Sequence, residues 1–142
     1  FEGIKAELAD KSPLPTLKPT DFIADMGAAY RAADLVISRA GASSISEFCL
    51  IGKPVILVPS PNVAEDHQTK NAMALVNRQA ARFVSDAEAT QKLIPLALQT
   101  VNNDQTLSQL SHNIKQMALR NSAEIIADEV IALAQEQAAK TR

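Results

Sequence analysis

Residues 34–47 read DLVISRAGASSISE, and this stretch decides the fold. Its first half, Leu35 to Ile37, is an apolar run of the kind that forms a buried strand. The small residues around Gly41 then favour a turn, and the residues after them suit a helix. A strand that passes directly into a helix predicts an α/β fold with a parallel sheet, in which ligands bind where the strands end.

A second unit of the same kind follows this stretch. Residues 55–58 (VILV) are typical of a strand buried on both faces, and Gly52 and Pro54 before them indicate the end of a helix. We therefore expect a Rossmann-like parallel sheet flanked by helices. The expected strands are 34–38, 55–58 and 81–84, with 14–19 a short edge strand or an extended loop. The expected helices are 2–10, 25–32, 43–51, 65–78, 85–101, a segment around 107–117 and a last one from about 121.

The helix expected after the first turn begins with backbone N–H groups that have no partner inside the helix. Gly41 permits a sharp turn and the close approach of a ligand, and Ala42, Ser43 and Ser44 keep the surrounding side chains small. Amides at a helix start favour a phosphate or an electron-rich hydroxyl. Glu47 would repel a phosphate, but its carboxylate suits the two hydroxyls of a ribose. The stretch therefore indicates a site for a nucleoside diphosphate.

A purely structural interpretation fits the same residues. Ser44 and Glu47 have the spacing of a capping box, in which each side chain bonds the backbone N–H of the other. Ser85 and Glu88 have the same spacing and predict a second capping box at the start of the helix expected at 85–101. Gly41 is also typical of a plain turn. The spacing alone leaves the ligand and capping interpretations open.

Further polar residues lie near the start of the helix expected at 65–78. Gln68 and Asn71 are three residues apart, on one face, and their amides suit the hydroxyls of a hexose, although polar residues are common in first turns. His67 could touch a diphosphate or a sugar, or be solvated. Arg39 could stabilise a leaving diphosphate or brace its loop by bonding carbonyls, and its place before the glycine favours the brace.

The composition is that of a chain with one hydrophobic core. Its 142 residues are 46% hydrophobic, which predicts a single domain. A net charge of −2 gives no electrostatic case for binding nucleic acid or an anionic membrane. The one cysteine, Cys49, is expected in the core, without a disulfide or a metal cluster. The sequence has no signal-like N-terminus and no apolar run of transmembrane length, so we expect a cytoplasmic chain.

Five blocks of the sequence together resemble one family. They are 22–26 (FIADM), 33–42 (ADLVISRAGA), Glu47, 52–59 (GKPVILVP) and 68–72 (QTKNA). In this combination they are similar to the bacterial MurG family of N-acetylglucosaminyltransferases. Members of that family transfer GlcNAc from UDP-GlcNAc to undecaprenyl-diphosphate-linked N-acetylmuramoyl-pentapeptide, lipid I, and so make lipid II for peptidoglycan.

The resemblance implies a GT-B glycosyltransferase whose C-terminal half binds UDP-GlcNAc, with residues 1–142 as most of that half and the N-terminal acceptor domain absent. It implies an inverting transfer without a metal or another cofactor. The general base is then expected in the absent domain, and this chain is expected to contain no catalytic residue. The residues implied to bind the donor are Ile23 through its backbone for uracil, Ala42 to Ser44 for sugar and phosphate, Glu47 for ribose, and Gln68 and Asn71 for GlcNAc.

The expected partners are UDP-GlcNAc and, through the absent domain, lipid I. The full-length protein would lie peripherally on the cytoplasmic face of the inner membrane, and this chain alone would be inactive. Two alternatives stay open: the donor-binding subunit of a split two-chain glycosyltransferase, and part of a GT-B-like UDP-GlcNAc 2-epimerase. A dinucleotide-dependent enzyme is poorly supported, since Gly41 stands alone where a G-x-G-x-x-G run would be needed.

Overall fold

The computed structural model describes residues 17–61 and 66–140 of the chain. The chain divides into two compact units, Phe1–Ala33 and Asp34–Arg142, and each is described by itself. The helix expected at 2–10 and the first part of the segment 14–19 lie outside the described residues, and residues 17–19 form no strand. The single domain expected from the composition stays a prediction.

In the first unit, helix α2 spans Met26–Ala32, within one residue of the predicted bounds. Asp25 caps this helix, because its Oδ1 accepts a hydrogen bond from the backbone N–H of Ala28 at 2.8 Å. Ile23 lies just before the cap, and its side chain is 43% exposed.

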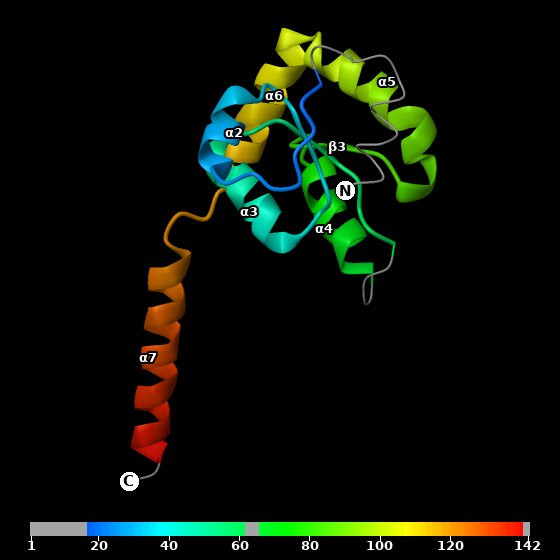
Figure 1. The fold of residues 1–142 in the computed structure, drawn as a ribbon. Helices are drawn as coiled ribbons and strands as arrows, with labels where there is room; N and C mark the ends of the chain where they lie inside the picture. The colour runs from blue at the N-terminus through cyan, green and yellow to red at the C-terminus, as the bar shows by residue number, and fades with distance from the viewer. Residues whose placement is uncertain (1–16, 62–65, 141–142) are drawn as a thin grey trace. The chain divides into compact units, whose positions relative to one another are not determined.

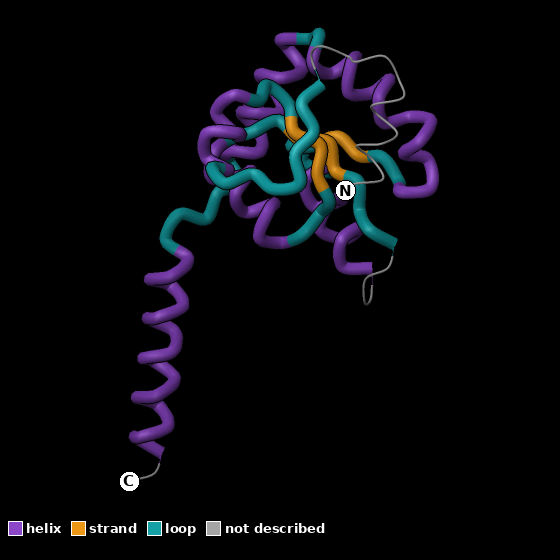
Figure 2. Tube along the Cα trace, in the orientation of Figure 1, coloured by secondary structure: helices purple, strands orange, loops and turns teal. Residues whose placement is uncertain are grey.

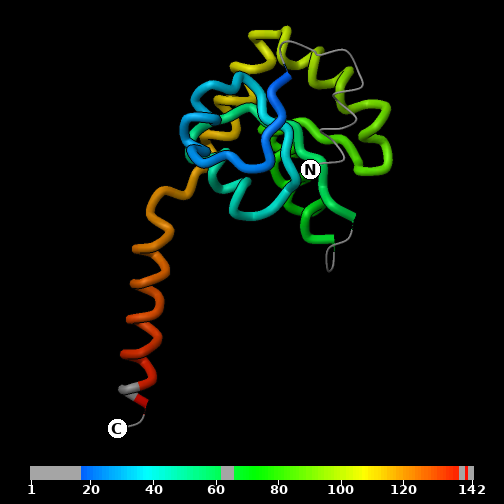
Figure 3. The backbone as a smooth tube through the Cα atoms, viewed as in Figure 1, coloured from blue at the N-terminus to red at the C-terminus, as the bar shows by residue number. Residues whose placement is uncertain are grey.

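The second unit contains a parallel sheet in the order β1-β2-β3. The strands are β1 (Val36–Ser38), β2 (Val55–Leu57) and β3 (Arg82–Phe83). Helices α3 (Ala42–Ile51) and α4 (His67–Val76) connect successive strands, a path that can be followed along the tube in Figure 3. The predicted α/β class, parallel sheet and three strands are confirmed, although each strand is one or two residues shorter than predicted.

Four more helices follow β3. They are the 3-10 helix η2 (Asp86–Glu88), α5 (Ala89–Val101), α6 (Asp104–Lys115) and α7 (Ser122–Lys140). α6 contacts both α3 and α5, and α4 contacts β3 (Figure 1). The three strands thus lie among helices α3 to α6, as Figure 2 shows with the strands in orange.

The core is centred on β2, whose three residues are 0% exposed. Successive side chains of a strand point to opposite faces of the sheet. Ile56 packs with Val58, Val84 and residues of α5 on one face. Val55 and Leu57 point to the other face, where right-handed crossovers between neighbouring strands place both α3 and α4. The β-branched run therefore forms the strand that is buried on both sides, as predicted.

The end of α3 joins this core to α6. Gly52 ends α3 in the left-handed conformation with φ 67°, which confirms the predicted helix stop. The hydroxyl of Ser111 in α6 donates to the carbonyl oxygen of Gly52 at 2.7 Å. Cys49 is 5% exposed, and burial raises the pKa of its thiol above the usual value. The predicted core position of Cys49 is confirmed.

The predicted capping box at Ser85 and Glu88 is wrong. Ser85 is the N-cap of η2, but its hydroxyl donates to the Glu88 carboxylate at 2.8 Å and caps no N–H. The backbone N–H of Glu88 bonds the carbonyl oxygen of Ser85 at 3.1 Å instead, because the first turn is a 3-10 turn. Hydrogen bonds from Lys92 and then Ser85 hold the pKa of Glu88 below its usual range.

The last two helices differ in burial. Leu110 and Ile114 of α6 are buried in the core, and His112 is exposed. In α7, by contrast, all of residues 122–137 are exposed. Within the described part of the chain, no helix is long and apolar enough to cross a membrane.

Candidate functional site

The start of α3 is an uncapped helix end at the carboxyl edge of the sheet. Its N-cap is Gly41, no side-chain hydrogen bond caps it, and the N–H of Ile45 makes the first helical bond, to the Gly41 carbonyl oxygen at 3.0 Å. The N–H groups of Ala42, Ser43 and Ser44 precede that bond, so they point out of the helix end as donors. The helix dipole adds partial positive charge there. This end is therefore suited to an anion.

The capping-box interpretation of Ser44 and Glu47 is wrong. Such a box needs its serine at the N-cap, whereas Gly41 is the N-cap and Ser44 lies three positions inside the helix. Glu47 therefore lies in the second turn, exposed, on the face that it shares with Ser43 and Ser44. Its Cα is roughly 6 Å along the axis from that of Ser43, and helical side chains lean towards the N-terminus. Its Cα–Cβ bond is therefore tilted towards the uncapped end.

The turn before α3 does not require glycine. Gly41 has φ −68° and ψ 143°, an extended conformation open to any residue, so the sharp turn expected of it is wrong. A Cβ built there would meet no atom within 4 Å. The glycine instead leaves open space beside the start of the helix, where a ligand can approach the backbone closely.

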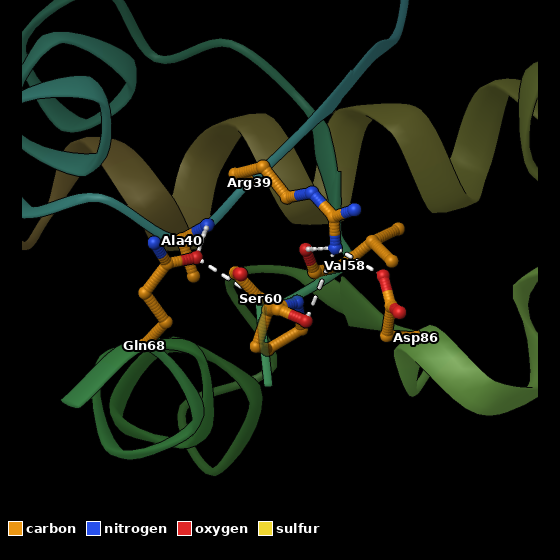
Figure 4. Close-up of polar contacts among 7 residues, drawn as sticks. Arg39, Ala40, Val58, Ser60, Gln68 and Asp86 are labelled. Carbon is orange, nitrogen blue, oxygen red and sulfur yellow. Dashed lines mark hydrogen bonds and ion pairs between the residues drawn. The ribbon is translucent and has the colours of Figure 1, made fainter. Parts of the chain in front are cut away.

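Two side chains of α4 bind the residue before this turn. Gln68 Oε1 accepts the N–H of Ala40 at 3.2 Å and the N–H of Ser60 at 2.9 Å (Figure 4). Asn71 Nδ2 donates to the carbonyl oxygen of Ala40 at 3.2 Å. Since Ala40 directly precedes Gly41, these bonds bring the start of α4 to the start of α3. The residues predicted at the start of α3 and those predicted at the start of α4 therefore lie close together. Gln68 and Asn71 share one face of α4, as predicted.

These hydrogen bonds also fix the orientation of both amides. A backbone N–H needs an acceptor, so the oxygen of Gln68 faces Ala40 and Ser60 and its Nε2 remains as a donor. A carbonyl needs a donor, so Nδ2 of Asn71 faces Ala40 and its Oδ1 remains as an acceptor. The pair therefore presents one donor and one acceptor in a fixed arrangement.

Arg39 braces two loops at this edge. Its Nη1 donates to the carbonyl oxygens of Val58 at 3.2 Å and Pro59 at 3.3 Å, and it forms an ion pair with Asp86 (Figure 4). The brace that the sequence favours for Arg39 is thus confirmed. A contact between Arg39 and a leaving diphosphate stays a prediction.

The other two predicted residues are His67 and Ile23. His67 is the first residue of α4 and is exposed. Asp66 takes the left-handed conformation with φ 54° and acts as the N-cap of α4, and the predicted helix start at residue 65 lies outside the described residues. Ile23 belongs to the first unit. The roles given to His67 and Ile23 stay predictions.

Sequence reasoning missed Ser60 and Asp86. Ser60 contributes its backbone N–H, which every residue except proline has, so its side chain gives no signal. Asp86 is 47 residues from Arg39 and stands inside a segment whose spacing indicates a helix cap. No local pattern connects either residue with the site.

Three hollows lined by described residues lie around the sheet. One of about 320 Å³ is lined by Arg39 and Asp86, and one of about 480 Å³ by Asp86 and Thr69. The largest, about 570 Å³, lies by Arg82 at the amino end of β3. Glu47, Gln68 and Asn71 line none of these three hollows. Among residues 17–61 and 66–140, no three acidic, histidine or cysteine side chains gather as metal ligands.

A parallel sheet with an uncapped helix start at the ends of its strands is the architecture of a nucleotide-binding α/β domain. The chain belongs to the glycosyltransferase family 28 C-terminal domain, whose family model matches residues 1–127. The resemblance to the MurG family is confirmed by similar proteins and by a solved structure, as follows.

Curated relatives carry the name UDP-N-acetylglucosamine--N-acetylmuramyl-(pentapeptide) pyrophosphoryl-undecaprenol N-acetylglucosamine transferase. One from Bacteroides fragilis is 70% identical over 135 residues, which are 95% of this chain and 34% of that protein. One from Cytophaga hutchinsonii is 50% identical over 130 residues, which are 92% of this chain and 34% of that protein. The crystal structure of Acinetobacter baumannii MurG matches with a TM-score of 0.81 and 32% identity, over 92% of this chain and 40% of that one. The chain thus spans about a third of the length of the curated relatives it matches.

Proposed function

We propose that this chain is the donor-binding part of a glycosyltransferase that moves GlcNAc from UDP-GlcNAc to lipid I and so makes lipid II. The observation that carries the proposal is the joining of two features at Ala40. An uncapped helix start suited to a diphosphate lies next to two amide side chains oriented for a sugar. The names of the relatives, which specify a GlcNAc transferase and an undecaprenol-linked acceptor, support the choice of donor and acceptor.

The donor would extend along the start of α3. The N–H groups of Ala42 to Ser44 would bind the diphosphate, and Glu47, one turn further along, would accept hydrogen bonds from the ribose hydroxyls. Gln68 would donate to a GlcNAc oxygen, and Asn71 would accept from a GlcNAc hydroxyl. The uracil contact at the backbone of Ile23 belongs to the same proposal.

The chemistry proposed for this site is the stabilisation of the leaving group. As the C4 hydroxyl of the muramoyl sugar attacks the anomeric carbon of GlcNAc, the bond from that carbon to UDP breaks and negative charge develops on the diphosphate. Helix amides already aimed at the phosphate stabilise this charge without reorganising. The proton of the attacking hydroxyl would pass to a base outside this chain.

In this proposal, the rest of the longer protein binds the acceptor and contacts the membrane. An undecaprenol-linked acceptor is held in a lipid bilayer, so the enzyme must work at a membrane surface, which we place on the cytoplasmic side. The 2-epimerase alternative gains no support, because the relatives carry transferase names. The split-subunit alternative predicts activity when this chain is mixed with a separate acceptor-binding chain.

Calorimetric titration of the chain with UDP-GlcNAc, UDP and ADP tests the proposal directly. We expect saturable binding of UDP-GlcNAc and UDP and much weaker binding of ADP, because the helix start serves any diphosphate but the base contact serves uracil. The chain alone should form no lipid II from UDP-GlcNAc and lipid I. Absence of binding of all three nucleotides, or lipid II formation by the chain alone, would contradict this assignment.

The variant Gln68→Glu tests the sugar contact without removing the clamp. A glutamate oxygen still accepts the N–H groups of Ala40 and Ser60, but the donor that faces the sugar becomes an acceptor. We expect the loss of UDP-GlcNAc affinity to exceed the loss of UDP affinity by about 1–2 kcal/mol, with the melting temperature nearly unchanged.

The added charge weakens both ligands alike, so the difference between them isolates the sugar contact. Gln99→Glu, an exposed position of α5, is the matched control for net charge and should change neither affinity. Equal losses for UDP and UDP-GlcNAc in Gln68→Glu would remove Gln68 from the sugar site.

A further inference from the structure

Asp86 anchors the network of contacts at the carboxyl edge of the sheet. It is the first residue of η2, between Val84, which is buried in the hydrophobic cluster around Ile56, and Ala89, which is partly buried and packs against that cluster. Its backbone is therefore held by the core on both sides. Its carboxylate forms an ion pair with Nη1 of Arg39.

The contacts lead from Asp86 to the sugar-facing amide in three steps. Asp86 holds the guanidinium of Arg39, and the same Nη1 donates to the carbonyl oxygens of Val58 and Pro59. The next residue, Ser60, donates its N–H to Gln68 Oε1 at 2.9 Å. Asp86 thus restrains the loop after β2, and that loop restrains Gln68 (Figure 4).

We propose that Asp86 is a positioning residue that fixes the orientation of the Gln68 amide towards the sugar of the donor, acting through Arg39 and the loop after β2. The inference rests on the proposed function of this site. The ion pair of Asp86 leads to Arg39, and the hydrogen bonds of Arg39 lead to the loop after β2 and not to the start of α3. The effect of Asp86 should therefore fall on the sugar and leave the UDP half of the donor unchanged.

A structural role in overall stability is a poor alternative for this ion pair. The side chains of Arg39 and Asp86 are 55% and 38% exposed, and exposed ion pairs contribute little to the free energy of folding. The pair instead fixes the position of the guanidinium group. Nη1 of Arg39 contacts two carbonyl groups of the loop after β2 and the carboxylate of Asp86.

The test uses the longer transferase that contains this chain, with KM for UDP-GlcNAc, kcat and the inhibition constant of UDP measured for each variant. In Asp86→Ala we expect KM for UDP-GlcNAc to rise about five- to tenfold, with kcat and the inhibition constant of UDP within about twofold of wild type. Asp86→Glu should return KM to within about twofold of wild type, because a carboxylate again reaches Arg39.

Glu88→Gln is the matched control. Glu88 lies on the same short helix and pairs with Lys92 one turn away, so its removal leaves the Arg39 contacts intact. It should leave all three constants unchanged.

Two results would overturn the inference while leaving the proposed function intact. One is an Asp86→Ala enzyme whose KM for UDP-GlcNAc stays within twofold of wild type. The other is a parallel rise in KM and in the inhibition constant of UDP, which would indicate general disruption of the site. A wild-type protein that transfers no GlcNAc would instead overturn the proposed function itself, and the inference with it.

Discussion

Glu47→Gln is expected to lower the affinity of the chain for UDP by about 1.5–3 kcal/mol, the range for hydrogen bonds to a charged group. This corresponds to a loss of about 10- to 150-fold in binding. Glutamine keeps the length of the side chain but has one acceptor oxygen and no charge, so it cannot hold both ribose hydroxyls as a carboxylate does. Titration calorimetry with UDP on both proteins measures the effect.

The melting temperature of Glu47→Gln should stay close to that of the wild type. Glu47 lies in the second turn of a helix whose N-cap is Gly41, so the substitution removes no cap. Glu129→Gln, an exposed position of α7, provides the same change of charge away from the site and should leave UDP binding unchanged. An unchanged UDP affinity in Glu47→Gln, with a wild type that binds UDP, would exclude Glu47 from the site.

Ile56→Ala should destabilise the chain by about 2–5 kcal/mol, the usual cost of removing a large aliphatic side chain from a core. Ile56 is 0% exposed, lies in the central strand and packs against Val58, Val84 and α5. The midpoint of urea unfolding should fall while the slope of the transition stays the same.

Ile94→Ala on α5 is the control for this core substitution. Its side chain is 60% exposed, so the same chemical change should cost about 0.5 kcal/mol or less. Similar losses for Ile56→Ala and Ile94→Ala would mean that β2 is not the centre of the core.

Local patterns predict the parts of this fold that local interactions decide. The β-branched run at 55–58 predicts β2 because only a strand buried on both faces uses such a run. Gly52 predicts the end of α3 because it alone among neighbouring residues takes a left-handed φ without strain. Helices α2, α3 and α6 likewise begin or end within a few residues of the predicted positions.

The start of α3 shows why the details of the site escape the sequence. Ser44 and Glu47 have the local pattern of a cap, yet the helix begins earlier, at Ala42. Ala40 is held by Gln68 and Asn71, 28 and 31 residues further along, and these contacts fix the chain just before the helix. No sequence pattern indicates that residues so far apart along the chain contact each other. Candidate residues around the start of α3 could therefore be chosen from the sequence, but not the contacts that orient them.

Backbone N–H groups, and not side chains, orient the Gln68 amide, and this affects which mutations near it can be tolerated. Every amino acid except proline supplies an N–H at position 60, so substitutions of the Ser60 side chain leave that contact of Gln68 available, whereas Ala40 is 0% exposed and leaves no room for a larger side chain. The orientation of the Gln68 amide is thus insulated from most substitutions at position 60. Position 60 already stands between Pro59 and Pro61, and a third proline there is the one replacement that would remove its contribution outright.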